Sequence, residues 1–322
     1  MNLINAKKYV GSGRLELSVF HEPNIPQYAI LSHTWGNKNE EVTFSELIPK
    51  SCHNAVDRGC DYVWIDTCCI DQSSSAELSY GINSMFRWYK NSSICIVYLA
   101  DYHDQEWRIH TMPRPCRWFT RGWTLQELIA PKHVVFFNAK WARLGRKKDL
   151  VDSIQQITKI DKGLLLHDSP LRESLREYSI SHKMAWASNR QTQRPEDRVY
   201  SLLGIFGICM PVLYGEGVSG AFRRLQLEII KETSDMSIFA WGSQNNSQGS
   251  KPHSFCSILA ESLEQFQFEK RGSDLGWYLP QENRTRALQV EIKIGGNEAR
   301  LCILIDSTQA QPSRCPRSQD VQ

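Results

Sequence analysis

The sequence predicts an α/β fold in which a parallel sheet is flanked by helices. Four short apolar segments, rich in β-branched and aromatic residues, alternate with segments of helical periodicity. The apolar segments have few polar positions, as expected for strands that are covered on both faces. Alternation of strands with helices is typical of parallel sheets, because two parallel strands need a long crossover connection.

The four expected strands are Tyr28–Ser32, Tyr62–Asp66, Ile94–Leu99 and His133–Phe137. The interval between the first two accommodates a helix over residues 44–56. Ser74 and Glu77 have the spacing of a capping box, which predicts the start of a second helix. The apolar residues behind this box recur at helix spacing. They are Leu78, Ile82, Met85, Phe86 and Tyr89.

The pattern changes after about residue 140. Helices are expected over 150–157, 174–187 and 221–232, and β-like segments over 237–241, 287–292 and 299–305. Residues 244–252 read as a polar loop. The predicted division is an α/β domain at 1–140, a helical extension at 141–242, a small β-rich C-terminal segment at 243–307 and a disordered tail at 308–322, which is rich in Gln, Ser, Pro and Arg.

Composition narrows the class of protein. The 322 residues carry a formal net charge of +3, without the concentrated basic stripe of a nucleic-acid surface, so no nucleic-acid partner is expected. The N-terminus lacks an apolar signal region, and no apolar run is long enough for a membrane span. Ten cysteines show no CxxC spacing, which favours reduced thiols and a cytoplasmic location. The basic cluster Arg143, Arg146, Lys147 and Lys148 is expected to be solvated.

The run from Cys116 to Pro131 is the strongest candidate for chemistry. Trp123 and Glu127 lie four residues apart and would share one face of a short helix between the third and fourth strands. The alternative interpretation makes Glu127 a solvated helix residue and Trp123 a core residue. A carboxylate beside aromatic rings can stabilise an oxocarbenium-like centre while stacking holds a planar leaving group, which suits cleavage of an N-glycosidic bond.

Polar side chains follow three of the expected strands. Because open α/β sheets bind ligands outside the carboxyl ends of their strands, these residues are predicted to converge on one site. Glu127 is the predicted catalytic residue. The predicted substrate-binding residues are Ser32, His33 and Trp35 after the first strand, Asp66 and Asp71 after the second, and Arg121 and Trp123 after the third.

Other chemistries have weaker support. Cys68 or Cys69 could form a nucleophile set with His33 and Asp66, but no local signature accompanies it. A metal site from Asp66, Asp71 and His33 lacks motif spacing, so no metal is expected. The sequence has no Walker loop and no GxGxxG after a strand. A later charged trio is interpreted as a structural ion-pair network. It comprises Glu196, Asp197 and Arg198.

Several runs together resemble the fungal heterokaryon incompatibility (HET) domain family. They are Tyr28–Gly36, Asp61–Gln72, Ser75–Ser79, Ile82–Tyr89, Arg121–Leu128, Glu196–Gly204 and Tyr214–Gly217. This resemblance spans residues 1–242. It implies a role in fungal non-self recognition, in which unlike individuals are kept apart by cell death. It also implies an effector that is switched by oligomerisation or by a sensor partner, so a homo-oligomer is expected in the active state.

The HET family is itself similar to Toll/interleukin-receptor (TIR) domains. The order of Ile94–Leu99, Trp123–Leu128 and His133–Phe137 is similar to the TIR order of strand, glutamate-bearing helix and strand. This resemblance implies a TIR-like (flavodoxin-like) sheet and cleavage of NAD, as substrate rather than resident cofactor, by Glu127. Thr124 departs from the cysteine of the TIR pattern. The alternative is a non-enzymatic module that kills by self-assembly or recruitment, with Glu127 as an interface or capping residue.

Overall fold

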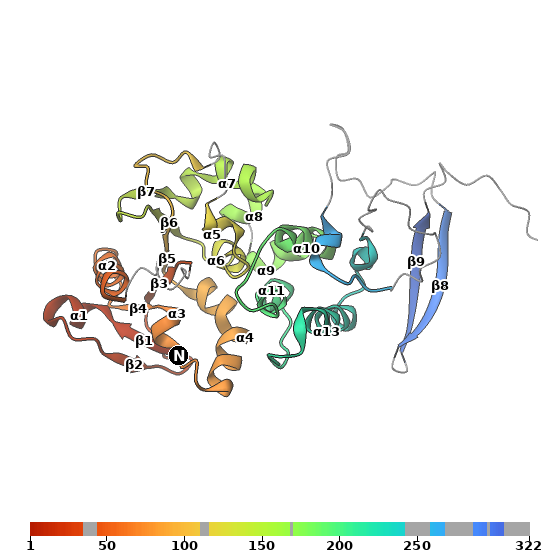
Figure 1. The fold of residues 1–322 in the computed structure, drawn as a ribbon, viewed down its shortest axis with the longest axis horizontal. Coiled ribbons are helices and arrows are strands. Elements are labelled where there is room, and N and C mark those ends of the chain that lie inside the picture. Colours follow the sequence, from red (N-terminus) through yellow and green to blue (C-terminus); the bar gives the residue numbers. More distant parts are fainter. Residues whose placement is uncertain are drawn as a thin grey trace, which may run out of the picture. The chain divides into compact units, whose positions relative to one another are not determined.

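The computed structural model describes residues 1–34, 44–109, 116–167, 170–241 and 258–267, together with 286–294 and 297–305. For 44–46 and for the last two segments it describes the backbone alone. Contacts divide the chain into two units, Met1–Gln267 and Phe268–Gln322 (Figure 1). In the second unit, β8 (Arg286–Ile294) and β9 (Asn297–Ile305) form an antiparallel pair, which confirms the two late strands.

The first unit is built on a mixed seven-stranded sheet in the order β2-β1-β4-β3-β5-β6-β7. Its centre is parallel and contains the four predicted strands. They are β3 (Tyr28–Ser32), β4 (Tyr62–Trp64), β5 (Ile94–Tyr98) and β6 (Val134–Phe137). Nearly every residue of these strands is buried, as their continuous apolar character predicts.

Both edges of the sheet are antiparallel, so the expectation of a purely parallel sheet is wrong there. On one side β1 (Asn2–Asn5) pairs with β4 and with β2 (Leu17–Val19). On the other side β7 (Arg143–Arg146) pairs with β6. The connection between β6 and β7 is too short for a crossover and forces the antiparallel arrangement. These edge strands are short and partly polar, and therefore carry little strand signal in the sequence.

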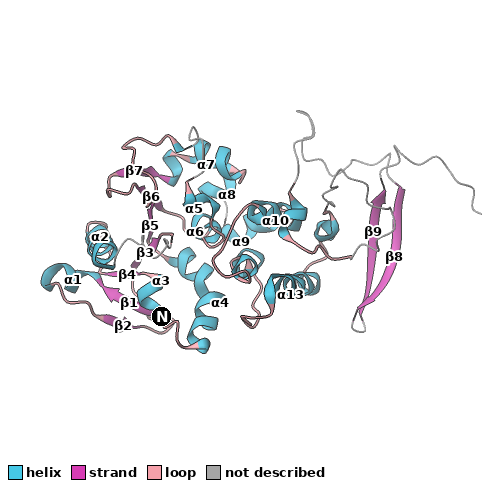
Figure 2. Cartoon of the chain, viewed as in Figure 1, coloured by secondary structure: helices cyan, strands magenta, loops and turns pink. Residues whose placement is uncertain are grey.

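Helices cover the sheet and continue beyond it (Figure 2). The helices up to β6 are α1 (Ala6–Ser12), α2 (Phe44–Val56), α3 (Asp66–Cys69), α4 (Ser75–Asn91), α5 (Arg117–Thr120) and α6 (Thr124–Ile129). The later ones are α7 (Val151–Thr158), α8 (Lys162–Leu166), α9 (Leu171–Glu177), α10 (Ile180–Ser188), α11 (Asp197–Tyr200), α12 (Leu203–Phe206) and α13 (Gly217–Glu232). Short 3₁₀ turns among the described residues include η2 (Lys147–Asp149), η3 (Met236–Phe239) and η4 (Leu263–Phe266). None of the helices in the described ranges is long and apolar enough to cross a membrane.

Three expectations about local structure need correction. The helix expected over 174–187 is two helices, because the Ser179 hydroxyl accepts a bond from the His182 N–H and starts α10 anew. The strand expected over 237–241 is the 3₁₀ turn η3. Ser74 caps α4 as predicted, but the Glu77 carboxylate accepts bonds from Asn2 and from the Asp71 N–H instead of completing a capping box.

The order of the central strands creates a point where the chain reverses direction across the sheet. From β3 the chain passes to β4 on one side, and then returns over β3 to β5 and β6 on the other side. Such a reversal opens a crevice at the carboxyl ends of the strands, where α/β proteins bind ligands. Ser32 is the last residue of β3, and Asp66 lies two residues beyond β4. The fold therefore places both at this crevice.

The segment after the sheet packs directly against the turn between α5 and α6. The Gln191 N–H donates to Thr120 O at 2.7 Å, and the Gly122 N–H donates to Gln191 O at 2.9 Å. A Cβ at Gly122 would lie only 2.5 Å from Thr192 Cγ2, so glycine is needed for this close approach. The residues before α6 are thus fixed against the segment that precedes α11. The sheet also continues to β7, beyond the expected domain boundary at residue 140.

Candidate functional site

A pocket opens at the crevice of the sheet. Its volume is about 140 Å³, comparable with an engineered cavity that admits a benzene ring. The described residues that line it are His33, Thr34, Asp66, Ile70, Gln72, Leu78, Ile82, Met85, Arg121, Trp123, Thr124, Glu127, Gln193, Arg194, Asp197 and Tyr214. Aliphatic side chains of α4, two aromatic rings and charged groups of both signs therefore meet around one small space.

Glu127 is the most deeply buried carboxylate of the pocket. It lies in the first turn of α6, and the residue is only 6% exposed. The Ser32 hydroxyl donates to its Oε2, while Trp118 Nε1 donates to Ser32 Oγ at 2.7 Å. An indole N–H can only donate, so it turns the single proton of Ser32 toward Glu127. The interpretation of Glu127 as a solvated helix residue is thus wrong.

Burial dominates the protonation of Glu127. Removal of the carboxylate from water raises its pKa to about 8, and the charge of Asp66 acts in the same direction. The bond from Ser32 lowers the pKa, as do a hydrogen bond with Tyr89 and the charge of Arg190, but these effects are smaller than that of burial. A carboxyl that titrates close to neutrality inside a pocket is typical of functional sites.

His33 and Asp66 form the part of the pocket that follows β3 and β4. His33 Nδ1 lies 3.7 Å from Asp66 Oδ1, and the Asp66 side chain is about one quarter exposed. Asp66 Oδ1 also accepts the Thr67 N–H at 2.8 Å, which fixes the carboxylate at the start of α3. Both residues therefore lie at the pocket, as the positions of their strands predict.

Arg121 and Trp123 line the pocket from the turn between α5 and α6. Three other predicted site residues are placed differently. Ser32 is buried and is not among the lining residues, and its hydroxyl donates to the Glu127 carboxyl. Asp71 is exposed and is not among the lining residues, because its carboxylate accepts bonds from the N–H and hydroxyl of Ser73 in a surface turn. Trp35 lies outside the described residues.

The far wall of the pocket comes from the segment beyond the sheet. Asp197, at the start of α11, accepts a hydrogen bond from the Tyr214 hydroxyl at 2.8 Å. The Arg194 guanidinium lies over the Tyr214 ring at 4.2 Å. Sequence reasoning did not include these residues in the site. Their signals in the sequence were the run around Asp197, whose charged side chains were interpreted as an ion-pair network, and the run Tyr214–Gly217, which contributed only to the family resemblance.

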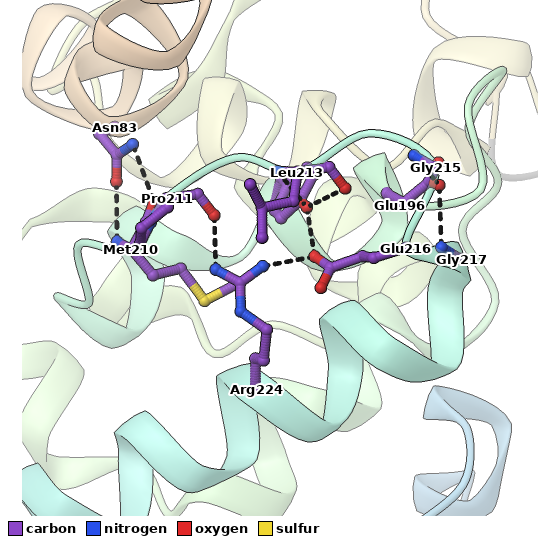
Figure 3. Close-up of polar contacts among 10 residues, drawn as sticks. Asn83, Glu196, Met210, Pro211, Leu213, Gly215, Glu216, Gly217 and Arg224 are labelled. Carbon is purple, nitrogen blue, oxygen red and sulfur yellow. Dashed lines mark hydrogen bonds and ion pairs between the residues drawn. The ribbon is translucent and has the colours of Figure 1, made fainter.

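That charged trio does not form a network of its own. The Glu196 carboxylate accepts the N–H groups of Gly215 and Gly217 at 3.0 and 3.1 Å (Figure 3). Arg198 pairs with Glu264 at 2.6 Å. Asp197 faces the pocket instead. Glu196 and Arg198 have the structural roles that were expected, but each acts through a partner elsewhere in the chain.

The loop that carries Tyr214 is fixed at both ends (Figure 3). Before the loop, Asn83 of α4 exchanges two hydrogen bonds with the backbone of Met210, at 3.1 and 3.2 Å. Arg224 of α13 joins the two ends of the loop, because it donates to Glu216 at 2.5 Å and to Pro211 O at 2.6 Å. Charge-assisted bonds of this kind are stronger than neutral ones, so the loop has one well-defined position against α4.

Two buried cationic side chains and one partly buried imidazole fix both ends of α6. At its C-terminus Lys147 donates to Leu128 O and Pro131 O, and His167 Nε2 bonds to Ile129 O. At its start Arg190 donates to Arg121 O and to the Thr124 hydroxyl. Burial lowers the pKa of Lys147 to about 7. The expectation that Lys147 is solvated is therefore wrong, because the carbonyls at the end of α6 need a donor.

The thiol and metal alternatives receive no structural support. Burial raises the pKa of both Cys68 and Cys69, the opposite of the activation that a thiolate nucleophile needs. Within the described ranges, no group of three or more His, Cys, Asp or Glu side chains is arranged to hold a metal ion.

Comparison of the sequence with known proteins shows similarity to two family models and to a curated protein. Residues 28–114 match the family model of the heterokaryon incompatibility protein (HET), and residues 220–279 match a domain of unknown function (DUF8212). A curated relative, the vegetative incompatibility protein HET-E-1 of Podospora anserina, is 43% identical over 229 residues. The alignment covers 65% of this chain and 16% of the relative, about one sixth of that protein's length. No solved structure matches the chain.

Proposed function

Because the chain carries a heterokaryon incompatibility domain, as its motifs predicted, we propose that the protein acts in fungal vegetative incompatibility by hydrolysing NAD. The name of the curated relative supports the biological role. The chemistry is supported by one observation above all, the buried Glu127 carboxyl that Ser32 and Trp118 orient at the pocket. Depletion of NAD by an effector that clusters in the cytoplasm would link this chemistry to cell death.

The pocket has the features that N-glycosidic cleavage requires. The bond between the ribose C1′ and the pyridinium nitrogen breaks, and its electron pair leaves with neutral nicotinamide. The ionised Glu127 stabilises the positive charge that develops on the ribose. A water oxygen then bonds to C1′ and releases one proton to solvent, which yields ADP-ribose. The ring of Trp123 and the aliphatic side chains of α4 provide a surface for the planar leaving group.

The TIR-like (flavodoxin-like) assignment forms part of this proposal. The parallel strand order β4-β3-β5-β6 supports it, since doubly wound sheets of that order bind ligands where the chain reverses direction. The carboxyl group of Glu127 lies at this reversal.

The test is NAD consumption by purified protein that is clustered through a fused oligomerisation domain. Wild type is compared with Glu127→Gln, which keeps the shape of the side chain but removes its charge. Glu173→Gln is the matched control, because Glu173 is an exposed helix carboxylate outside the pocket. We expect wild type and Glu173→Gln to consume NAD, and Glu127→Gln to lose at least 100-fold in rate, on the order expected for loss of a transition-state charge.

Toxicity in fungal cells completes the comparison. If none of the three proteins consumes NAD while all three kill cells, the proposal is wrong and the domain acts as an assembly or recruitment module. If Glu127→Gln alone fails to kill, cell death depends on the carboxylate.

A further inference from the structure

Asp197, on the far wall of the pocket, is a carboxylate that has no role in the chemistry described above. Asp197 is the first residue of α11, and the segment that precedes this helix is held against the turn between α5 and α6 by the backbone bonds of Gln191 with Thr120 and Gly122. Its neighbours Glu196 and Arg198 are engaged in bonds within the protein. Asp197 alone of the three lines the pocket.

The hydrogen bonds of Asp197 leave it able to accept more. Its Oδ1 accepts the Tyr214 hydroxyl at 2.8 Å, and Trp123 provides a second side-chain hydrogen bond. Among the described residues it forms no ion pair within 4 Å. An ionised carboxylate has about four acceptor positions, and it cannot donate. A ligand that meets this group in the pocket is therefore recognised through its own donors.

The charged side chains near Asp197 restrict which hydrogen-bond donors a ligand can present to it. Arg121 and Arg194 both interact electrostatically with Asp197, and both line the pocket. Their positive charges oppose a cationic group at this wall, and the carboxylate opposes a phosphate. Neutral hydroxyl groups satisfy both conditions. A pair of adjacent hydroxyls on a sugar can use the two oxygens of one carboxylate, as acidic residues do with ribose in dinucleotide-binding sites.

We propose that Asp197 binds the 2′- and 3′-hydroxyls of the nicotinamide ribose, and so holds C1′ next to Glu127. This inference rests on the proposed function, because it assigns a part of NAD to the far wall of the same pocket. Tyr214 and Trp123 position the carboxylate, and the network of Figure 3 fixes the loop that carries Tyr214. The pocket is thus completed by a segment that lies outside the sheet.

The test is a thermodynamic cycle that combines the substitution of Asp197 with the removal of one hydroxyl group from the substrate. The value of kcat/KM is measured for wild type and Asp197→Asn, each with NAD and with an analogue that lacks the 3′-hydroxyl of the nicotinamide ribose. Any intrinsic difference in reactivity between the two substrates cancels, because each variant is compared on the same substrate. We expect Asp197→Asn to lower kcat/KM about 10- to 100-fold for NAD, as for loss of hydrogen bonds to a charged group, and by a factor several times smaller for the analogue, which keeps only the contact of its 2′-hydroxyl.

A binding measurement keeps the inference testable if Asp197→Asn does not fold. Glu127→Gln retains Asp197 and should bind NAD at least tenfold more tightly than the 3′-deoxy analogue. Equal affinities, or equal losses for both substrates in the cycle, would overturn the inference. Hydrolysis of NAD by wild type with unchanged kinetics in Asp197→Asn also overturns it, but leaves the proposed function intact. Absence of hydrolysis by clustered wild type refutes the proposed function itself.

Discussion

Glu127 shows how a single residue can be suited to chemistry at a cost in stability. Its carboxyl is buried beneath the pocket, and one oxygen accepts the hydroxyl of Ser32. Hydrogen bonds of this kind favour the ionised form, whereas removal from water favours the neutral form, and here the effect of burial is larger. With a pKa of about 8, Glu127 is mostly neutral at neutral pH, and the ionised form that the proposed chemistry requires becomes the major form near pH 8.

The pH dependence of the reaction follows from this titration. For free enzyme and substrate, kcat/KM reports the pKa of the free enzyme. We expect log kcat/KM for NAD to rise with a slope near one from pH 6 and to level off above about pH 8. A steady-state profile between pH 5.5 and 9.5 measures this. A flat profile across that range would show that Glu127 is already ionised or takes no part in the reaction.

The same titration predicts how stability changes with pH. The folded-state pKa of Glu127, about 8, lies above the usual value of 4.5 for a glutamate in water, so ionisation opposes folding. Below pH 4.5 the group does not lower the free energy of unfolding, and above pH 8 it lowers this free energy by the full amount. A shift of this size corresponds to at most about 5 kcal/mol of unfolding free energy, because one pKa unit is about 1.4 kcal/mol.

Glu127→Gln removes that penalty and retains an acceptor for Ser32. We expect urea unfolding at pH 9 to show the variant more stable than wild type by a few kcal/mol, with the gain shrinking toward pH 5. A variant that is less stable than wild type at pH 9 would show that the charge of Glu127 is stabilised by its surroundings.

Individual residues were predicted from sequence only where spacing carried the information. Trp123 and Glu127 could be placed together because four residues make one helix turn and a strand precedes them. Asp197 and Lys147 could not be placed, because their positions depend on segments that meet only in the folded chain. Lys147 bonds to backbone carbonyls 16 and 19 residues away, which no local pattern encodes.

At the scale of elements, the site depends on short helices that cannot be stable alone. The helix α6 has six residues, and isolated helices of that length do not persist in water. Bonds from Lys147, His167 and Arg190 satisfy its end groups, and packing of later helices supplies the rest. The helix α12, for example, packs on α4, whose side chains form the apolar wall of the pocket.

Gly204 of α12 makes this packing possible. A Cβ at this position would lie 2.0 Å from Phe86 Cβ, and neither atom can move without a shift of its helix. We expect Gly204→Ala to lower the free energy of unfolding by about 1–3 kcal/mol, as for an overpacked core.

A glycine in an open position supplies the control for that substitution. Gly11 lies in α1, and a Cβ there meets nothing within 4 Å. Gly11→Ala should stabilise the protein by up to about 1 kcal/mol, because alanine favours the helix. Urea unfolding of both variants gives the comparison, and equal effects would mean that α12 does not approach α4 closely.

The elements that could be predicted are those with a strong local pattern. The four central strands are continuous apolar runs, and α4 and α13 carry regular apolar periodicity, whereas α2 was predicted only from the length of the interval between two strands. The antiparallel strands β1, β2 and β7 of the first unit have three or four residues each, and η3 is an apolar segment with the composition of a strand. In such short segments, tertiary contacts rather than local preference decide the conformation.

At the scale of the whole molecule, the pocket belongs to neither of the two parts that the sequence suggested. Residues up to 140 supply Glu127, Asp66 and the sheet, whereas Asp197 and Tyr214 come from the segment beyond. Residues 258–267 also belong with this unit, because η4 contacts α10 and Glu264 pairs with Arg198. The division observed in the contacts falls after Gln267. All the described residues that line the pocket therefore lie within the first unit.

Two truncated chains distinguish the observed division from the expected one. A chain of residues 1–267 keeps the whole sheet, the anchors of α6 and both walls of the pocket, so we expect cooperative thermal unfolding and NAD hydrolysis when it is clustered. A chain that ends at Lys140 lacks β7, Lys147 and Asp197. It leaves the carbonyls of Leu128 and Pro131 buried without donors, and loses the apolar contacts of the later helices. We expect it to show no cooperative transition by circular dichroism, and a cooperative, NAD-hydrolysing chain of residues 1–140 would refute a pocket that depends on Asp197.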